Sequence, residues 1–133
     1  MEDGVWGTAV ELDLSRLSPA PWRLQEECPE QDADVGVFAA DGKVVTLGDV
    51  MACVDLAFIA LARNAFNVMV RRGWGLGFSG QEGPMQGWLV LLPKEMYPLD
   101  HRLYPLANLR ATDPFTALVE ADKWYRENCE QQP

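Results

Sequence analysis

The longest stretch of the chain without proline or glycine lies between Asp49 and Gly73. Apolar residues recur there every three or four positions, which predicts an amphipathic helix: Val54, Phe58, Leu61, Ala65, Val68 and Met69. Asp49 is a suitable N-cap, and Gly73 can adopt the left-handed conformation that ends many helices. We therefore expect a helix over residues 49–72. Because its apolar face is wide, we expect it to be largely buried at the centre of the fold.

Extended stretches led by tryptophan precede this helix and a second one, so the chain contains two similar blocks. The first block, residues 21–72, contains Asp41-Gly42 between apolar runs, a strong hairpin signal. The second block, residues 73–128, has two apolar strands and a helix over residues 113–128, with Asp113 as its N-cap. This order predicts a single α+β domain over residues 1–133. One antiparallel sheet of about four to five strands would pack against two main helices, and the blocks suggest a strand–strand–helix duplication.

The net charge of the protein is −9, and most of the excess acid lies in the first 50 residues. Direct binding of nucleic acid requires a basic surface that displaces counterions, so we expect no such binding. We also expect no membrane association, because no apolar run approaches the roughly 20 residues that span a bilayer and the acidic balance disfavours anionic membrane surfaces. The acidic N-terminus lacks the features of a signal peptide, which predicts a cytoplasmic protein.

Cysteine and histidine contents argue against a disulfide framework and against a metal site. The three cysteines, Cys28, Cys53 and Cys129, are widely spaced and form no Cys-x-x-Cys pair. His101 is the single histidine, and the acidic residues show no metal-ligand spacing around it. We therefore expect neither a metal nor a cofactor, and the sequence contains no catalytic constellation.

An acidic segment is the first candidate binding site. Its residues are Glu26, Glu27, Glu30, Asp32 and Asp34. A solvated loop is the simpler interpretation, because runs of charge are usually solvated. The alternative is a docking surface for a basic protein. A third interpretation, an inhibitor that mimics the phosphates of nucleic acid, requires these carboxylates to lie on one rigid face.

A second candidate site combines the glycine-rich segment of residues 75–80 with residues 97–106. The glycines match G-x-G-x-x-G, but a dinucleotide-binding loop follows a strand and opens a helix, whereas a helix is expected before this segment. A glycine-rich hairpin is the favoured interpretation. If the long connection folds over it, Tyr97, His101 and Tyr104 could converge on a small-molecule or enzymatic pocket.

Pro21-Trp22-Arg23, the Asp41-Gly42 turn and the helix that follows resemble a pattern in small uncharacterised phage, prophage and bacterial proteins. Residues 113–125 are similar to the ends of bacterial hypothetical proteins. The resemblance implies a bacterial or phage origin and a structural role for the tryptophans, and it implies no activity. The expected function is therefore a non-enzymatic cytosolic accessory protein that binds another protein.

Overall fold

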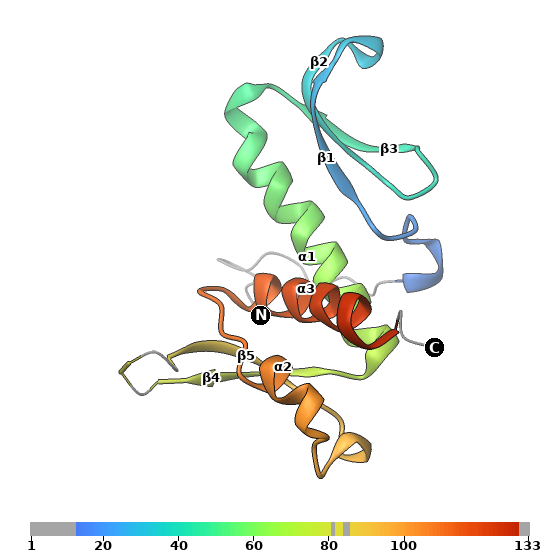
Figure 1. The fold of residues 1–133 in the computed structure, drawn as a ribbon. Coiled ribbons are helices and arrows are strands. Elements are labelled where there is room, and N and C mark those ends of the chain that lie inside the picture. The colour runs from blue at the N-terminus through green and yellow to red at the C-terminus, as the bar shows by residue number, and fades with distance from the viewer. Residues whose placement is uncertain (1–12, 81, 84–85, 131–133) are drawn as a thin grey trace, which may run out of the picture.

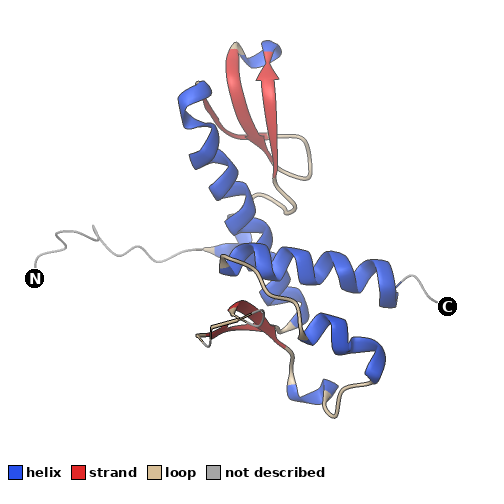
Figure 2. Ribbon diagram, turned by 60° about the vertical axis from the view of Figure 1, so that its left-hand side comes forward, coloured by secondary structure: helices blue, strands red, loops and turns tan. Residues whose placement is uncertain are grey.

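The protein has an α+β architecture in which one long helix, α1 (Cys53–Arg72), joins two antiparallel sheets. The computed structural model describes residues 13–80, 82–83 and 86–130. Figures 1 and 2 show the sheets at opposite ends of α1. The expectation of one sheet is wrong, because the described strands form separate sheets of three and two strands. The sheets stay separate because they pack against different halves of α1, which has 20 residues and is about 30 Å long.

The first sheet is built from two consecutive hairpins. Its order is β1 (Arg23–Cys28), β2 (Ala33–Phe38) and β3 (Val44–Gly48). The expected Asp-Gly turn between β2 and β3 is confirmed, with Gly42 at φ 85°. The acidic segment is not a loose loop. It forms the end of β1, a 3₁₀ turn and the start of β2, because the strands keep one register up to the turn, interrupted only at Glu27 and Asp34.

The N-terminal half of α1 packs against this sheet. Leu56 and Ala60 of the helix form a buried cluster with Val35 and Val37 of β2. The start of β1 is attached to the same helix through Asn64. Its side-chain oxygen accepts the backbone N–H of Trp22 at 2.7 Å, and its amide donates to the Trp22 carbonyl at 2.8 Å.

The second sheet is the hairpin of β4 (Gly75–Ser79) and β5 (Gly87–Leu91). It confirms that the glycine-rich segment is a hairpin. The C-terminal half of α1, the hairpin and α3 (Pro114–Tyr125) enclose the larger core. The two helices contribute these buried members of the core: Ala65, Val68, Ala117, Leu118 and Ala121. The two blocks thus contain different numbers of strands, and their common origin stays a prediction.

A buried ion pair joins the end of α1 to α3. The Arg72 guanidinium donates to Asp122, which is buried on α3, and contacts Glu130 at 2.8 Å. It also lies over the rings of Trp74 and Tyr125, at 5.2 Å and 4.7 Å from the ring centroids. Burial opposes the charged form, but the hydrogen bonds to Glu130 and Asp122 raise the pKa of Arg72. The arginine therefore stays charged and fixes the two helices together at this end.

The ends of α1 agree with the sequence, but its burial does not. Asp49 caps the 3₁₀ turn Val50–Ala52 that leads into α1, and Gly73 ends it at φ 69°. The expectation of a largely buried helix is wrong, since Val54 is 79% exposed and Val70 is 65% exposed. The segment of residues 50–72 is, contrary to expectation, long and apolar enough to cross a membrane, judged by length and composition alone. Only 22% of its most apolar stretch is buried.

The connection between β5 and α3 contains two 3₁₀ turns and the short helix α2 (Tyr104–Ala107). Tyr97 precedes a proline and has the extended backbone that this position favours. Tyr104 also precedes a proline, yet it is helical, because Pro105 occupies the first turn of α2. Leu106 is buried in the larger core and anchors the connection.

Leu118→Ala should destabilise the protein strongly, because Leu118 is fully buried in the core between α1 and α3. We expect the free energy of unfolding to fall by about 2–5 kcal/mol in urea denaturation. Glu120→Ala, on the exposed side of the same helix, should change it by less than about 0.5 kcal/mol. Equal effects of the two substitutions would contradict the packing of α3 described above.

Asp113 should make the stability of α3 depend on pH. Its carboxylate accepts the Thr116 N–H at 2.8 Å. Hydrogen bonds from the Thr116 side chain and from the backbone hold the pKa of Asp113 below its ordinary value of 3.8, against the effect of burial. Because the folded-state pKa is the lower one, this stabilisation is complete above the ordinary value and is lost as pH falls through the folded value.

Urea denaturation at several pH values tests this cap. Asp113→Ala should lower the free energy of unfolding by about 0.5–2 kcal/mol at neutral pH, and the difference from wild type should narrow in acid. Asp113→Asn retains an oxygen acceptor and should keep most of the stability without the pH dependence. A difference between wild type and Asp113→Ala that stays constant into acid would show that the charge of Asp113 contributes nothing.

Candidate functional site

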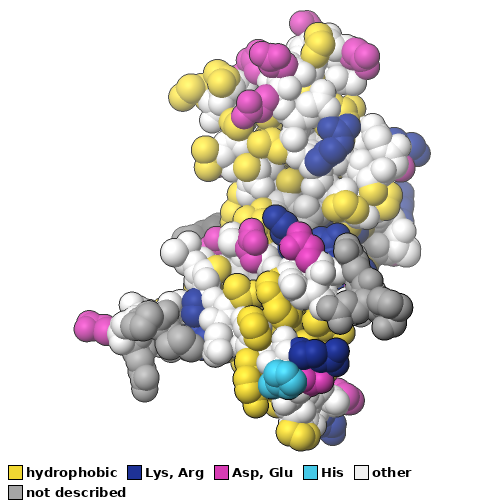
Figure 3. All heavy atoms as spheres, viewed as in Figure 1, with side chains coloured by type: hydrophobic (Ala, Val, Ile, Leu, Met, Phe, Trp, Pro, Cys, Tyr) yellow, Lys and Arg dark blue, Asp and Glu magenta, His cyan; other side chains and the backbone are white. Residues whose placement is uncertain are grey.

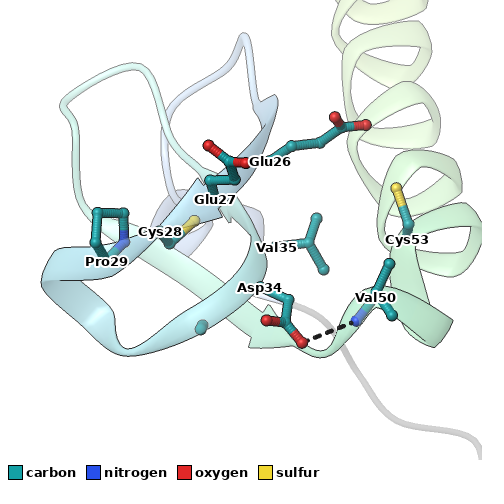
Figure 4. Close-up of a pocket in the computed structure, with 9 residues that line it drawn as sticks. Glu26, Glu27, Cys28, Pro29, Asp34, Val35, Val50 and Cys53 are labelled. Carbon is teal, nitrogen blue, oxygen red and sulfur yellow. Dashed lines mark hydrogen bonds between the residues drawn. The ribbon is translucent and has the colours of Figure 1, made fainter.

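An open cleft of about 800 Å³ lies between the β1–β2 hairpin and the start of α1. Figure 4 shows Val35 in the middle of this cleft, with Val50 and Cys53 on the helical side. The accessible apolar surface comes from Val50 and Cys53, because Val35 is only 1% exposed. Carboxylates surround it: Glu26, Glu27 and Asp34.

The strand register explains how these carboxylates meet. Glu26 lies opposite Val35 in the β1–β2 pair, and its side chain extends toward α1 (Figure 4). Glu27 has a positive φ of 63°, which interrupts the regular alternation of the strand. Asp34 accepts the backbone N–H of Val50 at 3.3 Å, so it ties the hairpin to the turn before α1.

The carboxylates of the cleft lack basic partners. Within the described residues, Glu26, Glu27 and Asp34 form no ion pair, and no group of three or more histidine, cysteine or acidic side chains is arranged to hold a metal. Like charges close together repel one another, so the cleft attracts a cationic group.

Binding of an anion in this cleft is disfavoured. The start of a helix offers free N–H groups to anions, but here the first of them already have acceptors. The Val50 N–H donates to Asp34, and the Met51 N–H donates to Asp49 at 3.0 Å. The cleft is therefore suited to positive and apolar groups rather than to phosphate.

The remaining acids of the predicted site lie elsewhere on the hairpin. Glu30 lines a separate hollow with Arg23 and Phe38 on the outer face of the sheet. Asp32 lines a third, shallow hollow, which it shares with Asp34. The structure thus brings three of the five acids to one cleft and distributes the other two over its surroundings.

Exposed apolar side chains adjoin the cleft on α1 and the turn before it. Val50 is 69% exposed, Met51 86% and Val54 79%. In Figure 3 acidic and apolar side chains gather together at the end of the molecule that holds the three-stranded sheet. The sequence did not indicate this surface, because apolar residues at helical spacing are typical of a buried face.

The second candidate site has less structural support. Tyr97 and Tyr104 are 52% and 53% exposed, and the side chain of His101 is 85% exposed. The ring Nδ1 of His101 lies 3.4 Å from Asp100. A hollow of about 200 Å³ near this segment is lined by other residues, among them Leu103 and Tyr125.

No protein family, curated protein or solved structure matches this chain.

Cysteine reactivity tests the geometry of the cleft. Cys28 is 1% exposed, whereas Cys53 and Cys129 are partly exposed. Because alkylation requires access to the thiolate, iodoacetamide should modify Cys53 and Cys129 in the folded protein at least about tenfold faster than Cys28, which must wait for local opening. Peptide mass spectrometry measures each rate, and the urea-unfolded protein is the control. Equal rates for Cys28 and Cys53 in the folded protein would contradict the burial of the hairpin.

Proposed function

We propose that this protein is a non-enzymatic cytosolic accessory protein that binds another protein through the acidic cleft. The observation that carries the proposal is the combination of the accessible apolar side chains of Val50 and Cys53 with three carboxylates that have no basic partner among the described residues. A surface of this composition suits a ligand that provides both an apolar contact and a positive charge.

The chemistry of the cleft specifies the kind of partner. An apolar side chain that enters the cleft beside Val50 and Cys53 would gain the energy of leaving water, about 1.5–3 kcal/mol for a whole Leu or Phe. Lysine or arginine residues next to it would face Glu26 and Glu27, and such rim charges mainly accelerate association and select the partner. The proposed ligand is therefore a basic segment with an apolar anchor.

The alternatives receive less support from the described residues. A small-molecule or enzymatic site at Tyr97, His101 and Tyr104 would require an enclosed pocket, and these side chains are mostly exposed. A nucleic-acid mimic would need the acids on one face, and they are divided over three hollows.

Charge reversal in the cleft tests the proposal. Peptides selected from a random display library on the wild-type protein should combine basic residues with an apolar anchor. Glu26→Lys/Glu27→Lys should weaken their binding at least about tenfold, because like charges would then face each other. Isothermal titration calorimetry measures the loss, and affinity capture from a bacterial lysate extends the comparison to whole proteins.

Glu30→Lys/Glu95→Lys is the matched control, since it changes the net charge equally at exposed sites that do not line the cleft. It should leave binding within about threefold of wild type, because neither side chain lines the cleft and salt screens exposed charges. Equal losses in both double variants would mean that net charge, rather than the cleft, controls binding. Selected peptides without basic residues would overturn the proposal.

A further inference from the structure

On one surface ridge of α1 the order of residue types is the same from either end of the helix. Residues four apart along the helix form a continuous ridge on its surface. Here one such ridge is Val54, Phe58, Ala62, Phe66 and Val70, so that valine and phenylalanine are repeated symmetrically about a central alanine. The ridge carries no charge.

This ridge is exposed along its length. Val54 is 79% exposed, Phe58 56%, Phe66 38% and Val70 65%, while Ala62 is partly exposed. The ridge is exposed because the two halves of α1 pack against different parts of the fold. Leu56 and Ala60 pack against the three-stranded sheet, whereas Ala65 and Val68 pack against α3 and the β4–β5 hairpin, and the ridge runs between these two buried faces.

We propose that two copies of this chain pair through the Val54–Val70 ridge, with their α1 helices antiparallel and a two-fold axis at Ala62. In this arrangement Phe58 of one copy meets Phe66 of the other, and Val54 meets Val70. Helices that interlock along such ridges cross at about −50°. The alanine at the crossing lets the two backbones approach closely.

The symmetry of the ridge identifies a second copy as its occupant. A two-fold interface must be self-complementary, because the same surface serves both partners. Binding of a different protein would not require the side chains of the ridge to be ordered symmetrically. The edge-to-face contact of Phe58 with Phe115 of α3, at 5.3 Å between ring centroids, already holds this side chain in position for binding.

The size of the exposed surface is consistent with a dimer. Met51, Ile59 and Met69 flank the ridge and are also exposed. Together with the ridge they expose the equivalent of about four whole side chains, or roughly 600 Å² at about 150 Å² each. A standard interface buries about 800 Å² per partner, so residues around this surface would have to supply only the remaining buried area.

Antiparallel pairing also suits the charge of the protein. The net charge is −9, and the acidic cleft lies at the N-terminal end of α1. Antiparallel helices place the two clefts at opposite ends of the dimer, about a helix length of 30 Å apart, where salt screens their repulsion. Parallel pairing would bring them together.

Insertion of α1 into a membrane is the competing use of this surface, and the packing opposes it. A helix that spans a bilayer is surrounded by lipid or by other apolar helices. The two other faces of α1 are covered by a sheet and by α3, and insertion would remove both. Asp55 and Arg63 on the same helix add a further cost in the bilayer.

Sedimentation velocity over a wide concentration range tests the dimer by charge substitution at paired positions. Wild type should be dimeric. Val54→Lys and Val70→Glu should each weaken dimerisation at least about a hundredfold, because the introduced charges lose water at an apolar interface. The double variant Val54→Lys/Val70→Glu should regain dimerisation, since each lysine then faces a glutamate of the other copy. An equimolar mixture of the two single variants should form a heterodimer.

Val44→Lys is the control, because it introduces the same charge at an exposed valine of β3, away from the ridge. It should remain dimeric, and circular dichroism should show all variants folded. A monomeric wild type would overturn the proposal, whether it binds neutral lipid vesicles or a foreign protein. Dimers that withstand both single substitutions would overturn it as well, as would a double variant that stays monomeric.

Because Val70 lies outside the cleft, Val70→Glu should keep its affinity for the selected peptides, so the dimer and the proposed function can fail separately.

Discussion

A single helix has to complete two separate cores, and this constraint shapes the rest of the protein. α1 buries Leu56 and Ala60 against the three-stranded sheet near its start, and Ala65 and Val68 against α3 and the hairpin near its end. Each half of the molecule is too small to enclose the helix, so each covers only one side of it. The two sides differ, and the surface between them remains apolar and open to solvent.

Polar contacts fix how each half sits on the helix. Asn64 pairs with both backbone groups of Trp22 and so sets the position of β1. Arg72 pairs with Asp122 while lying over two aromatic rings, and so sets the position of α3. Apolar packing alone tolerates sliding, whereas buried hydrogen bonds require particular partners, and these contacts therefore specify one arrangement of the two halves.

The same geometry separates the two proposed binding surfaces. The acidic cleft forms where the β1–β2 hairpin extends past the start of α1, and Asp34 holds it there through the Val50 N–H. The apolar ridge is centred on Ala62 in the middle of the helix. A dimer through the ridge would present two clefts facing apart, so that one assembly could hold two copies of a basic partner. Such a bivalent arrangement raises apparent affinity without additional contacts.

The sequence by itself determined the local structure. It located α1 and α3 with their caps at Asp49, Gly73 and Asp113, and it located the Asp-Gly hairpin, because these signals depend on neighbouring residues. It also singled out the acidic segment. Only the tertiary structure decided that the strands form two sheets, that Glu26, Glu27 and Asp34 share a cleft while Glu30 and Asp32 do not, and that α1 is exposed. The spacing of apolar residues shows which side chains share a helix face. Which faces become covered depends on elements that are distant in the chain.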